Sequence, residues 1–354
     1  MKNLVNKTKH MLKNKKARPF LIVGVIALVC GLVLTLTHAS GFFVSLEPEV
    51  GVNSPATAQS DSNASGGKYV RFGDGGSQNS GQNPYPDRGS AGFTGSPSSL
   101  TVIDSSSSAP AGTMWTSYGL RVTSSNVTLS NVHVKGGIYA SGGGTLTIRD
   151  SIIEGGAAWY IVTLRENTKI DAERVTFRWR DGSPRIDAEN GAGAVHLGAG
   201  TYSDSRIVNC DISGVADGLQ IAGDRWIVTD NWIHDLALGP TTHNDGIQVF
   251  GGSGHLIARN RIESGAINGH STGAIFTQGG SIGDLTIKDN FLDGGAYTIY
   301  LENGSVTVVD NIVGPNHVFG TRNILPSVTV TNWSNNCRGD SNGNKLSPCQ
   351  SLSP

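Results

Sequence analysis

The stretch HNDGIQV, residues 243–249, places an imidazole, an amide and a carboxylate side by side. A second carboxylate, Asp217, opens the related stretch DGLQI. Asp217 and Asp245 each stand two residues before an apolar residue, Leu219 or Ile247. If the two stretches are neighbouring parallel strands, the carboxylates lie about 5 Å apart.

A carboxylate pair at that separation has three possible uses, and the sequence leaves all three open. Asp217 and Asp245 can cleave a glycosidic bond as acid and nucleophile, since about 5 Å suits retention and mutual repulsion keeps one proton bound. They can bind Ca²⁺, which takes oxygen ligands from several carboxylates. They can also cap the turn before each strand by accepting backbone N–H groups.

His243 adds a titratable group in LALGPTTHND, a long connection before the strand. A histidine beside carboxylates suits general acid–base catalysis near neutral pH. A lyase would use His243 as base, with Arg225 or Ca²⁺ holding a uronate, whereas a hydrolase would use the two aspartates directly. We assign the neighbouring Asn244 to substrate binding. The alternative is that His243 is an ordinary surface histidine.

Two repeating patterns must position these residues. In the first, an asparagine column is formed by Asn231, Asn260, Asn290, Asn311 and Asn332, at spacings of 29, 30, 21 and 21 residues. In the second, short strands are centred on Leu219, Ile247, Ile275 and Ile299, at spacings of 28, 28 and 24. Short strands repeating every 20 to 30 residues without helices predict an all-β solenoid. A β-sandwich does not explain the recurring asparagine unit.

Stacked rungs of a solenoid align equivalent residues into columns, with the asparagines hydrogen-bonding along the stack in a turn. Strand alternation predicts an outward column beside the apolar one. Its members are Arg121, His196, Gln220, Gln248, Phe276 and Tyr300. The preceding small residues, such as Gly218 and Gly246, predict a shallow trough beside it. Amides and rings suit a sugar, although such residues are also ordinary on a solvated sheet face.

From about Trp115 to Asn336 the chain resembles right-handed parallel β-helix proteins of the pectate-lyase-like superfamily. More narrowly, it resembles bacterial surface β-helix proteins with HNDG-apolar-Q, GG…I-x-x-N and GG-x-Y-T-apolar-Y motifs, here residues 243–248, 251–260 and 294–300. The resemblance implies a single-stranded right-handed parallel β-helix. It implies carbohydrate binding or cleavage only as a tendency of the superfamily, because the narrower group has no settled activity.

The catalytic signatures of the superfamily do not carry over. Pectate lyases show W-I-D-H and R-x-P-x-x-R, whereas this chain has W-I-H-D at residues 232–235 and lacks the second motif. Polygalacturonases show N-T-D, D-D, G-H-G and R-I-K. This chain has only GSGH at residues 252–255 and NGH at residues 268–270.

The insert from Ala172 to Asn190 is the densest cluster of arginine and aromatic residues after the N-terminal segment. It contains Arg174, Arg178, Trp179, Arg180 and Arg185. These side chains could line a groove for an anionic chain. The alternative is a long loop stabilised by its own acidic residues, Asp181, Asp187 and Glu189.

The N-terminal segment, residues 1–44, predicts a membrane anchor. Seven basic residues and no acidic ones precede Pro19, and no charged residue occurs from Pro19 to Val44. About 20 apolar residues cross a bilayer as a helix, with the basic flank in the cytoplasm. We expect a signal anchor with the rest of the chain outside the cytoplasm. The alternative is a signal peptide cleaved after Ala39, which would release a secreted protein.

The remaining chain divides into a flexible linker (45–67), an N-terminal cover (68–114), the β-helix (115–336) and a tail (337–354). Cys337 and Cys349 bracket the tail sequence RGDSNGNKLSP and predict a disulfide loop in an oxidising compartment. The cysteines show no spacing typical of a zinc site.

Charge restricts the partners. Seven of the 27 basic residues lie in the N-terminal flank, so the other 20 face 28 acidic residues, a formal net charge of −8. A negative domain is a poor binder of nucleic acid. We therefore expect a monomer that binds a polysaccharide, with lyase or glycoside hydrolase activity as an open question and Ca²⁺ as its only candidate cofactor. The alternative function is a non-catalytic adhesin or surface-display protein.

Overall fold

The computed structural model describes residues 57–60, 68–71, 84–156, 160–180, 193–198, 200–237, 243–265 and 271–354. The chain forms two compact units, residues 1–82 and 83–354. In the first unit, β1 (Thr57–Ser60) and β2 (Lys68–Arg71) pair antiparallel, so part of the expected linker is a strand. Among the described residues, no helix has the length and apolar character needed to cross a membrane. The expected anchor, residues 1–44, lies outside the described residues.

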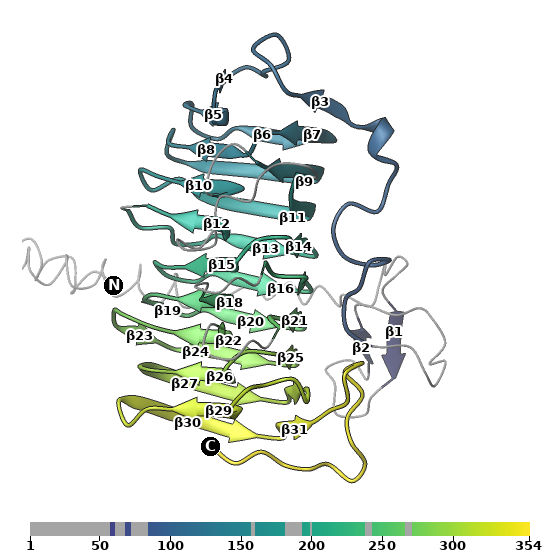
Figure 1. Ribbon diagram of the computed structural model, residues 1–354, viewed down its shortest axis with the longest axis vertical. Coiled ribbons are helices and arrows are strands. Elements are labelled where there is room, and N and C mark those ends of the chain that lie inside the picture. Colours follow the sequence, from purple (N-terminus) through teal and green to yellow (C-terminus); the bar gives the residue numbers. More distant parts are fainter. Residues whose placement is uncertain are drawn as a thin grey trace, which may run out of the picture. The chain divides into compact units, whose positions relative to one another are not determined.

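The second unit repeats a circuit of three strands, here called a rung, and each strand belongs to one of three sheets (Figure 1). The first sheet has ten strands. In spatial order these are β4 (Thr113–Thr116), β5 (Gly119–Val122), β8 (Ile138–Ala140), β10 (Val162–Leu164), β12 (Gly193–Leu197), β15 (Asp217–Ile221), β18 (Asn244–Val249), β22 (Ser271–Thr277), β26 (Tyr297–Leu301) and β29 (Gly320–Ile324).

The second and third sheets share two long strands that run through the bend between them, β9 (Thr145–Gly155) and β11 (Lys169–Trp179). The other strands of the second sheet are β6 (Thr128–Ser130), β13 (Arg206–Val208), β16 (Ile227–Thr229), β20 (Leu256–Ala258), β24 (Leu285–Lys288), β27 (Gly304–Val309) and β30 (Val328–Ser334). Those of the third are β3 (Thr101–Ile103), β7 (Val132–Lys135), β14 (Asp211–Ser213), β17 (Trp232–His234), β21 (Arg261–Glu263), β25 (Phe291–Asp293), β28 (Ile312–Val313) and β31 (Cys337–Arg338).

Nearly all strand pairs of this unit are parallel, and the exception among the three sheets is the hairpin of β4 and β5. A small parallel pair, β19 (Gly252–Ser253) with β23 (Ile282–Gly283), lies between the first and second sheets along the chain. Parallel strands stacked rung upon rung make this unit an all-β parallel β-helix, which confirms the solenoid expected from the repeats.

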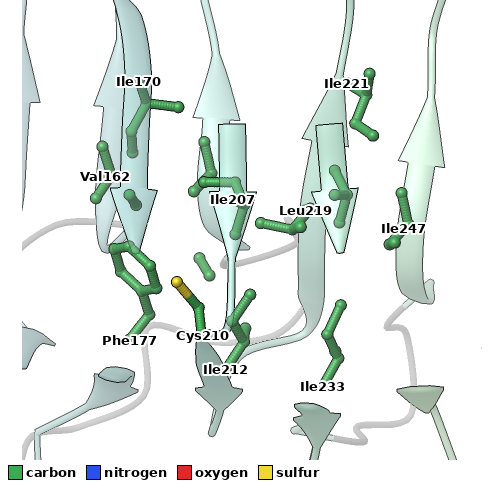
Figure 2. Close-up of a cluster of buried hydrophobic side chains, with 14 of the residues drawn as sticks. Val162, Ile170, Phe177, Ile207, Cys210, Ile212, Leu219, Ile221, Ile233 and Ile247 are labelled. Carbon is green, nitrogen blue, oxygen red and sulfur yellow. The ribbon is translucent and has the colours of Figure 1, made fainter. Parts of the chain in front are cut away.

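The interior is filled by apolar side chains that each sheet turns inward. Figure 2 shows Val162 and Leu219 of the first sheet, Ile207 of the second, and Phe177 and Ile233 of the third meeting there. All five are fully buried. A single rung cannot bury its apolar side chains by itself. The side chains become closely packed only when rungs stack, so the rungs stabilise one another.

The chain turns between the second and third sheets through two residues with distinct conformations and environments. The first residue takes a left-handed conformation, as Asp230, Arg259 and Asp289 do with φ of 61°, 54° and 54°. The second residue is buried, and in five rungs it is asparagine. These five residues are Asn231, Asn260, Asn290, Asn311 and Asn336, each at most 1 % exposed.

The five asparagines form a continuous amide ladder. The Nδ2 group of Asn260, for example, donates to Oδ1 of Asn290 at 3.0 Å and to the carbonyl oxygen of Val228 at 2.9 Å. The backbone N–H of Asn260 donates to the same Oδ1 at 2.9 Å. Equivalent bonds recur from Asn231 to Asn336, so the polar groups at the bend are satisfied from rung to rung.

The last member of this column was predicted wrongly from the sequence. Asn332 is exposed in β30, and Asn336 takes the place expected for it. The register between β27 and β30 shifts between Val306 and Thr307, where the pairing skips from Val330 to Asn332. This irregularity adds one residue before the bend. The ladder spacing from Asn311 to Asn336 is 25 residues, whereas the sequence pattern assumed the 21 residues that separate Asn290 from Asn311.

Residues 84–100 run along the outer side of the third sheet toward the first rung (Figure 1). The Tyr85 ring packs against Phe291 at 5.8 Å, and the N–H of Gly92 donates to the carbonyl of Asn209 at 3.0 Å. Gly92 has φ of 75°, and a Cβ there would lie 2.6 Å from the Asp211 side chain. The β-helix itself begins at β3, which pairs with β7 and precedes the expected start at residue 115.

The tail closes the other end of the stack. Cys337 and Cys349 form a disulfide with Cα atoms 5.6 Å apart. Leu352 packs into the core, and its carbonyl accepts a hydrogen bond from Nε1 of Trp333 at 2.6 Å.

Truncating the amide ladder should destabilise the fold strongly. Asn290→Ala removes the acceptor of the Asn260 backbone N–H and the side-chain donor to the Ile257 carbonyl. The Asn260 and Asn311 amides each lose one hydrogen bond but keep another, to the Val228 carbonyl and from the backbone N–H of residue 290. Each buried group that loses its partner costs about 1–3 kcal/mol, so we expect a loss of at least about 2 kcal/mol in urea unfolding followed by circular dichroism. The exposed Asn332→Ala is the matched control and should change stability by less than about 0.5 kcal/mol. Equal losses for both variants would refute the ladder's role.

Candidate functional site

The outer face of the first sheet carries a column of side chains that we call the outer ladder. The strand register confirms the alignment of its members. In order along the stack they are Arg121, Tyr139, Thr163, His196, Gln220, Gln248, Phe276, Tyr300 and Asn323. Tyr139, Thr163 and Asn323 are additional to the residues predicted from the sequence.

A second column, which we call the corner row, lies where each rung enters the first sheet. Its members are Tyr160, Gly193, Asp217, Asp245, Gly273, Tyr297 and Gly320. The two aspartates are therefore neighbours in the stack, flanked on each side by a glycine and then a tyrosine. The rings of Tyr160 and Tyr297 contact outer-ladder side chains, which places this row on the outer face as well.

At the N-terminal end of this face, the rings of Tyr160 and His196 stack in parallel, with centroids 3.8 Å apart. Nδ1 of His196 lies 2.7 Å from Oε1 of Gln220. Burial lowers the pKa of His196, against the raising effect of the Gln220 hydrogen bond. The ring is thus neutral at pH 7, Nδ1–H donates to the amide oxygen, and Nε2 remains an acceptor.

At the C-terminal end, aromatic rings form a continuous cluster. The distances between ring centroids are 5.1 Å from Phe276 to Tyr300, 5.9 Å from Tyr300 to Tyr297 and 5.8 Å from Tyr297 to Phe319. Phe319 is 65 % exposed, whereas Phe276 is buried. A solvent-facing aromatic cluster of this kind is a common feature of binding surfaces.

The middle of the outer ladder is much less accessible. Gln220 and Gln248 are each 9 % exposed. Nε2 of Gln248 donates to Oε1 of Gln278 at 3.0 Å, and Gln220 holds His196. In the described structure these amides therefore hold neighbouring side chains in place, and little of their own surface is accessible to a ligand.

The aspartate pair is almost entirely buried, with Asp217 at 7 % and Asp245 at 1 % exposure. Oδ1 of Asp217 accepts the N–H of Asp245 at 3.1 Å, and Oδ1 of Asp245 accepts the N–H of Gly273 at 3.1 Å. Each carboxyl group thus caps the start of the next rung's strand, which is the third of the uses left open by the sequence.

Burial also controls the charge of this pair. Desolvation raises the pKa of Asp217 to about 7. The pKa of Asp245 is raised well above its ordinary value by desolvation and by the neighbouring Asp217 carboxyl. At least one proton is therefore retained near neutral pH.

His243 and Asn244 do not join the aspartates in an open cluster. His243 is exposed, and in the described structure no hydrogen bond or ion pair joins it to Asp217 or Asp245. Asn244 is fully buried and donates from Nδ2 to the carbonyls of Ala216 and Ala237 at 2.9 and 3.0 Å. Asn244 is thus a bracing residue of the corner in this structure, and its predicted role in substrate binding is not supported by its position.

The expected trough of small residues is wrong. A Cβ on Gly246 would lie 2.2 Å from Cγ2 of the core residue Ile262, and one on Gly218 would lie 2.9 Å from Cγ2 of Ile233. These glycines face the interior. The chain turns the corner there and places two successive residues inward, so simple alternation fails for one step.

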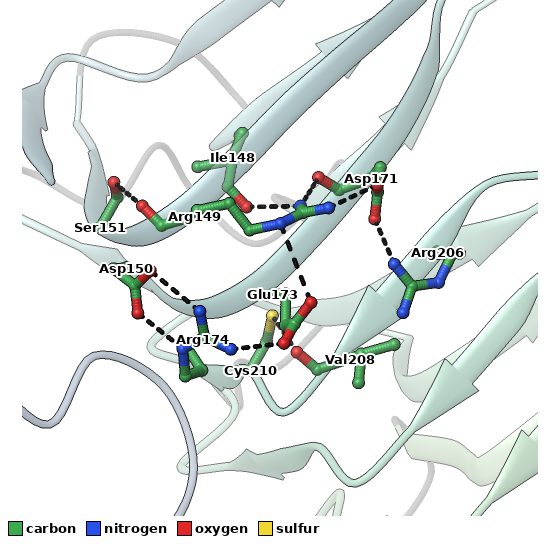
Figure 3. Close-up of polar contacts among 10 residues, drawn as sticks. All are labelled: Ile148, Arg149, Asp150, Ser151, Asp171, Glu173, Arg174, Arg206, Val208 and Cys210. Atoms are coloured by element: carbon green, nitrogen blue, oxygen red, sulfur yellow. Dashed lines mark hydrogen bonds and ion pairs between the residues drawn. The ribbon is translucent and has the colours of Figure 1, made fainter. Parts of the chain in front are cut away.

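The predicted cationic residues are already engaged. Arg225 pairs with Asp204 through Nε and Nη2 at 2.7 and 3.1 Å. Arg174 binds Asp150 and Glu173, as Figure 3 shows, and Arg178 binds Glu154 at 2.6 Å.

Both Arg174 and Arg178 belong to strand β11, so this part of the expected insert is β-helix and not a loop. Trp179 ends the same strand and is 7 % exposed. Arg185 and the acidic residues 181, 187 and 189 lie outside the described residues.

No group of three or more histidine, cysteine or carboxylate side chains that could hold a metal ion occurs in the described part of the chain. In each of Asp217 and Asp245, the carboxyl oxygen Oδ1 already accepts a backbone N–H group. Calcium binding by this pair remains a prediction.

Four further residues of this face were also missed in the sequence: Tyr160, Arg165, Tyr297 and Phe319. The stretch YIVTL, residues 160–164, is a further short strand of the repeating type, and recognising it would have revealed both Tyr160 and the ladder residue Thr163. Phe319 immediately precedes β29, whose sequence GTRNI resembles the other short strands less closely.

Residues 113–272 match the family model described as "Right handed beta helix region". This match agrees with the parallel stack of the described structure. No match to the chain was found among curated proteins or solved structures.

The raised pKa values of the aspartate pair predict that the stability of the fold depends on pH. Because the folded state holds the protons more tightly, the contribution to stability is complete below about pH 4 and is lost as the pH rises through about 7. Asp245→Asn keeps an acceptor for the N–H of Gly273 but removes the charge. We expect its melting temperature, relative to the unsubstituted protein, to be unchanged at pH 4 and clearly higher at pH 8.

Asp284→Asn is the matched control, since Asp284 is exposed and already has a left-handed φ of 49° that asparagine tolerates. Its melting temperature should follow that of the unsubstituted protein at every pH. A constant difference between Asp245→Asn and the unsubstituted protein from pH 4 to 8 would show that the pair is not protonated on folding.

Proposed function

We propose that this parallel β-helix protein binds an extended polysaccharide along the outer face of its first sheet. The observation that carries the proposal is the aromatic and imidazole groups that this face presents in register. His196 and Tyr160 form one accessible patch, and Tyr300, Tyr297 and Phe319 form another.

The chemistry of these patches fits sugars. Aromatic rings pack on the apolar C–H faces of a pyranose, while a neutral imidazole and phenol groups exchange hydrogen bonds with its hydroxyls. Parallel strands repeat about every 4.8 Å, so binding groups recur along the face at a constant interval, as sugar units do along a polymer. A linear ligand can therefore extend from the His196 patch to the Tyr300 patch across the rungs between them.

A second candidate function is cleavage of the bound polymer by Asp217 and Asp245. The observation in its favour is that burial raises the pKa of Asp217 to about 7, which suits a general acid. The observation against it is the 1 % exposure of Asp245 and the engagement of both carboxyls with backbone N–H groups. Binding without cleavage corresponds to an adhesin or surface-display protein.

We also propose that residues 19–44 anchor the protein in a membrane with the β-helix outside the cytoplasm. The Cys337–Cys349 disulfide supports this, because such bonds persist in oxidising compartments. Full-length protein expressed in cells should remain in the membrane fraction after alkaline carbonate washing. Release of a soluble form that begins at Ser40 would instead establish cleavage after Ala39.

The binding proposal predicts that His196→Ala and Tyr300→Ala weaken binding to the same glycan. The purified protein is titrated with a panel of neutral and acidic polysaccharides by calorimetry, and we expect each substitution to weaken binding about 5- to 20-fold, corresponding to about 1–2 kcal/mol. Tyr118→Ala, an exposed aromatic residue outside both patches, is the control and should bind normally. Unchanged binding by both patch variants would refute the assigned face.

The same mixtures distinguish the candidate functions. New ultraviolet absorbance indicates a lyase, and new reducing ends without it indicate a hydrolase. If a product forms and Asp245→Asn abolishes it, the second candidate is correct. If neither signal appears while the glycan binds, the protein is a non-catalytic binder.

A further inference from the structure

Arg165 occupies a third position on the outer face, immediately after β10. The backbone N–H of Arg165 donates to the carbonyl of Ala140 at 2.8 Å, and the backbone N–H of Gly198 donates to the carbonyl of Leu164 at 2.9 Å. These bonds continue the strand register by one residue. Arg165 is therefore beside Gly198 on the next rung, and alternation places its side chain on the same side of the sheet as Thr163.

The Arg165 side chain extends across Gly198. A Cβ on Gly198 would lie 2.2 Å from Cδ, 2.4 Å from Nε and 2.5 Å from Cζ of Arg165. Only a glycine leaves this space free. The guanidinium consequently lies beside His196, which is two residues before Gly198 on the same rung.

The next residues in this third column leave room in front of the guanidinium. Ala222 follows Gly198 in the stack, and Phe250, whose N–H donates to the carbonyl of Ile221 at 2.8 Å, follows Ala222. Two small residues thus separate an arginine from an aromatic ring. Because the Arg165 side chain already covers Gly198, the Ala222 methyl group is the only side chain between the guanidinium and Phe250 in this column, next to the outer-ladder residue Gln220.

Among the described residues, the Arg165 side chain has no hydrogen-bond or ion-pair partner. Its Nε atom is buried and makes no hydrogen bond, and no ion pair of Arg165 occurs among the described residues. Seven other arginines of the β-helix are paired with carboxylates: Arg149, Arg174, Arg178, Arg206, Arg225, Arg259 and Arg261. A partly desolvated guanidinium without a counter-charge is unfavourable, and an anionic group of a ligand at this patch would supply that charge.

We propose that Arg165 is an anion subsite that binds an acidic substituent, a carboxylate or a sulfate, of the polysaccharide lying on His196 and Tyr160. This inference rests on the proposed function and names the substrate class as an acidic glycan. The guanidinium fork matches a carboxylate or sulfate through two parallel N–H···O bonds. The substituent would lie over Ala222, beside the guanidinium that covers Gly198, while the sugar ring remains on the Tyr160–His196 stack.

The test compares Arg165→Gln with the unsubstituted full-length protein. Alginate, hyaluronan and heparin are titrated against each protein, together with the carboxyl-reduced or desulfated form of each polymer. We expect the unsubstituted protein to prefer an acidic polymer over its neutral form by at least about 10-fold, consistent with one charge-assisted bidentate pair. Arg165→Gln should abolish that preference and leave affinity for the neutral form unchanged.

Two further variants control for folding and geometry. Arg259→Gln removes an arginine paired with Asp230 on a different sheet bend and should keep the preference for acidic polymers. Arg165→Lys keeps the charge but not the fork, so it should retain only part of the preference. Thermal melts of all three variants identify any that are misfolded.

The outcomes separate this inference from the proposed function. Binding that depends on His196 and Tyr300, with no preference for acidic polymers or no effect of Arg165→Gln, overturns the anion subsite and leaves the binding face intact. A preference that depends on Arg165 but not on His196 or Tyr300 supports the subsite and overturns the proposed face. Failure of the unsubstituted protein to bind any of the six polymers overturns both.

Discussion

The bend between the second and third sheets is the constraint on which this structure depends. Each rung must turn sharply there, which takes backbone donors and acceptors out of the strand ladders and buries them. A left-handed residue followed by a buried asparagine solves the problem, because one amide satisfies its own rung and the next. The N-terminal rungs place Ser151, Val175 and Cys210 at this position, so the continuous amide ladder belongs to the C-terminal half.

Stacking in register converts a repeated pattern into rows of unlike residues. The inward positions tolerate little variation, since they must fill the same interior in every rung. The outward positions are free to vary, and across successive rungs they bring an imidazole, amides and rings into one line. A binding surface on such a fold is therefore assembled by rung spacing, and none of its residues needs to be close to another in the sequence.

In the aspartate pair, the burial that suits a structural role limits access of a substrate to the carboxyl groups. Capping a strand requires the carboxyl oxygens to accept N–H groups, and burial excludes water from them. Those conditions also raise the pKa values, which is the property a general acid needs. In this structure both carboxyl groups face the backbone of the next rung, so accessible binding groups are found on the residues around them, notably Tyr160, His196 and Arg165.

The sequence by itself determined the periodic features. The β-solenoid, the first four members of the amide ladder and the alignment of His196 through Tyr300 all follow from residue spacing, because equivalent positions of a repeat must stack. The spacing of Cys337 and Cys349 likewise indicated a loop that the structure closes.

Only the tertiary structure decided the features that break the period. The longer last rung, which includes a one-residue register shift in β30, places Asn336 and not Asn332 in the ladder. The corner turns Gly218 and Gly246 inward against simple alternation. Burial of Asp245 and the position of Arg165 over Gly198 depend on neighbouring rungs, and a linear pattern contains no information on which side chains lack partners. Periodicity is a local property that a sequence displays directly, whereas burial, charge pairing and register shifts arise only when the rungs are packed together.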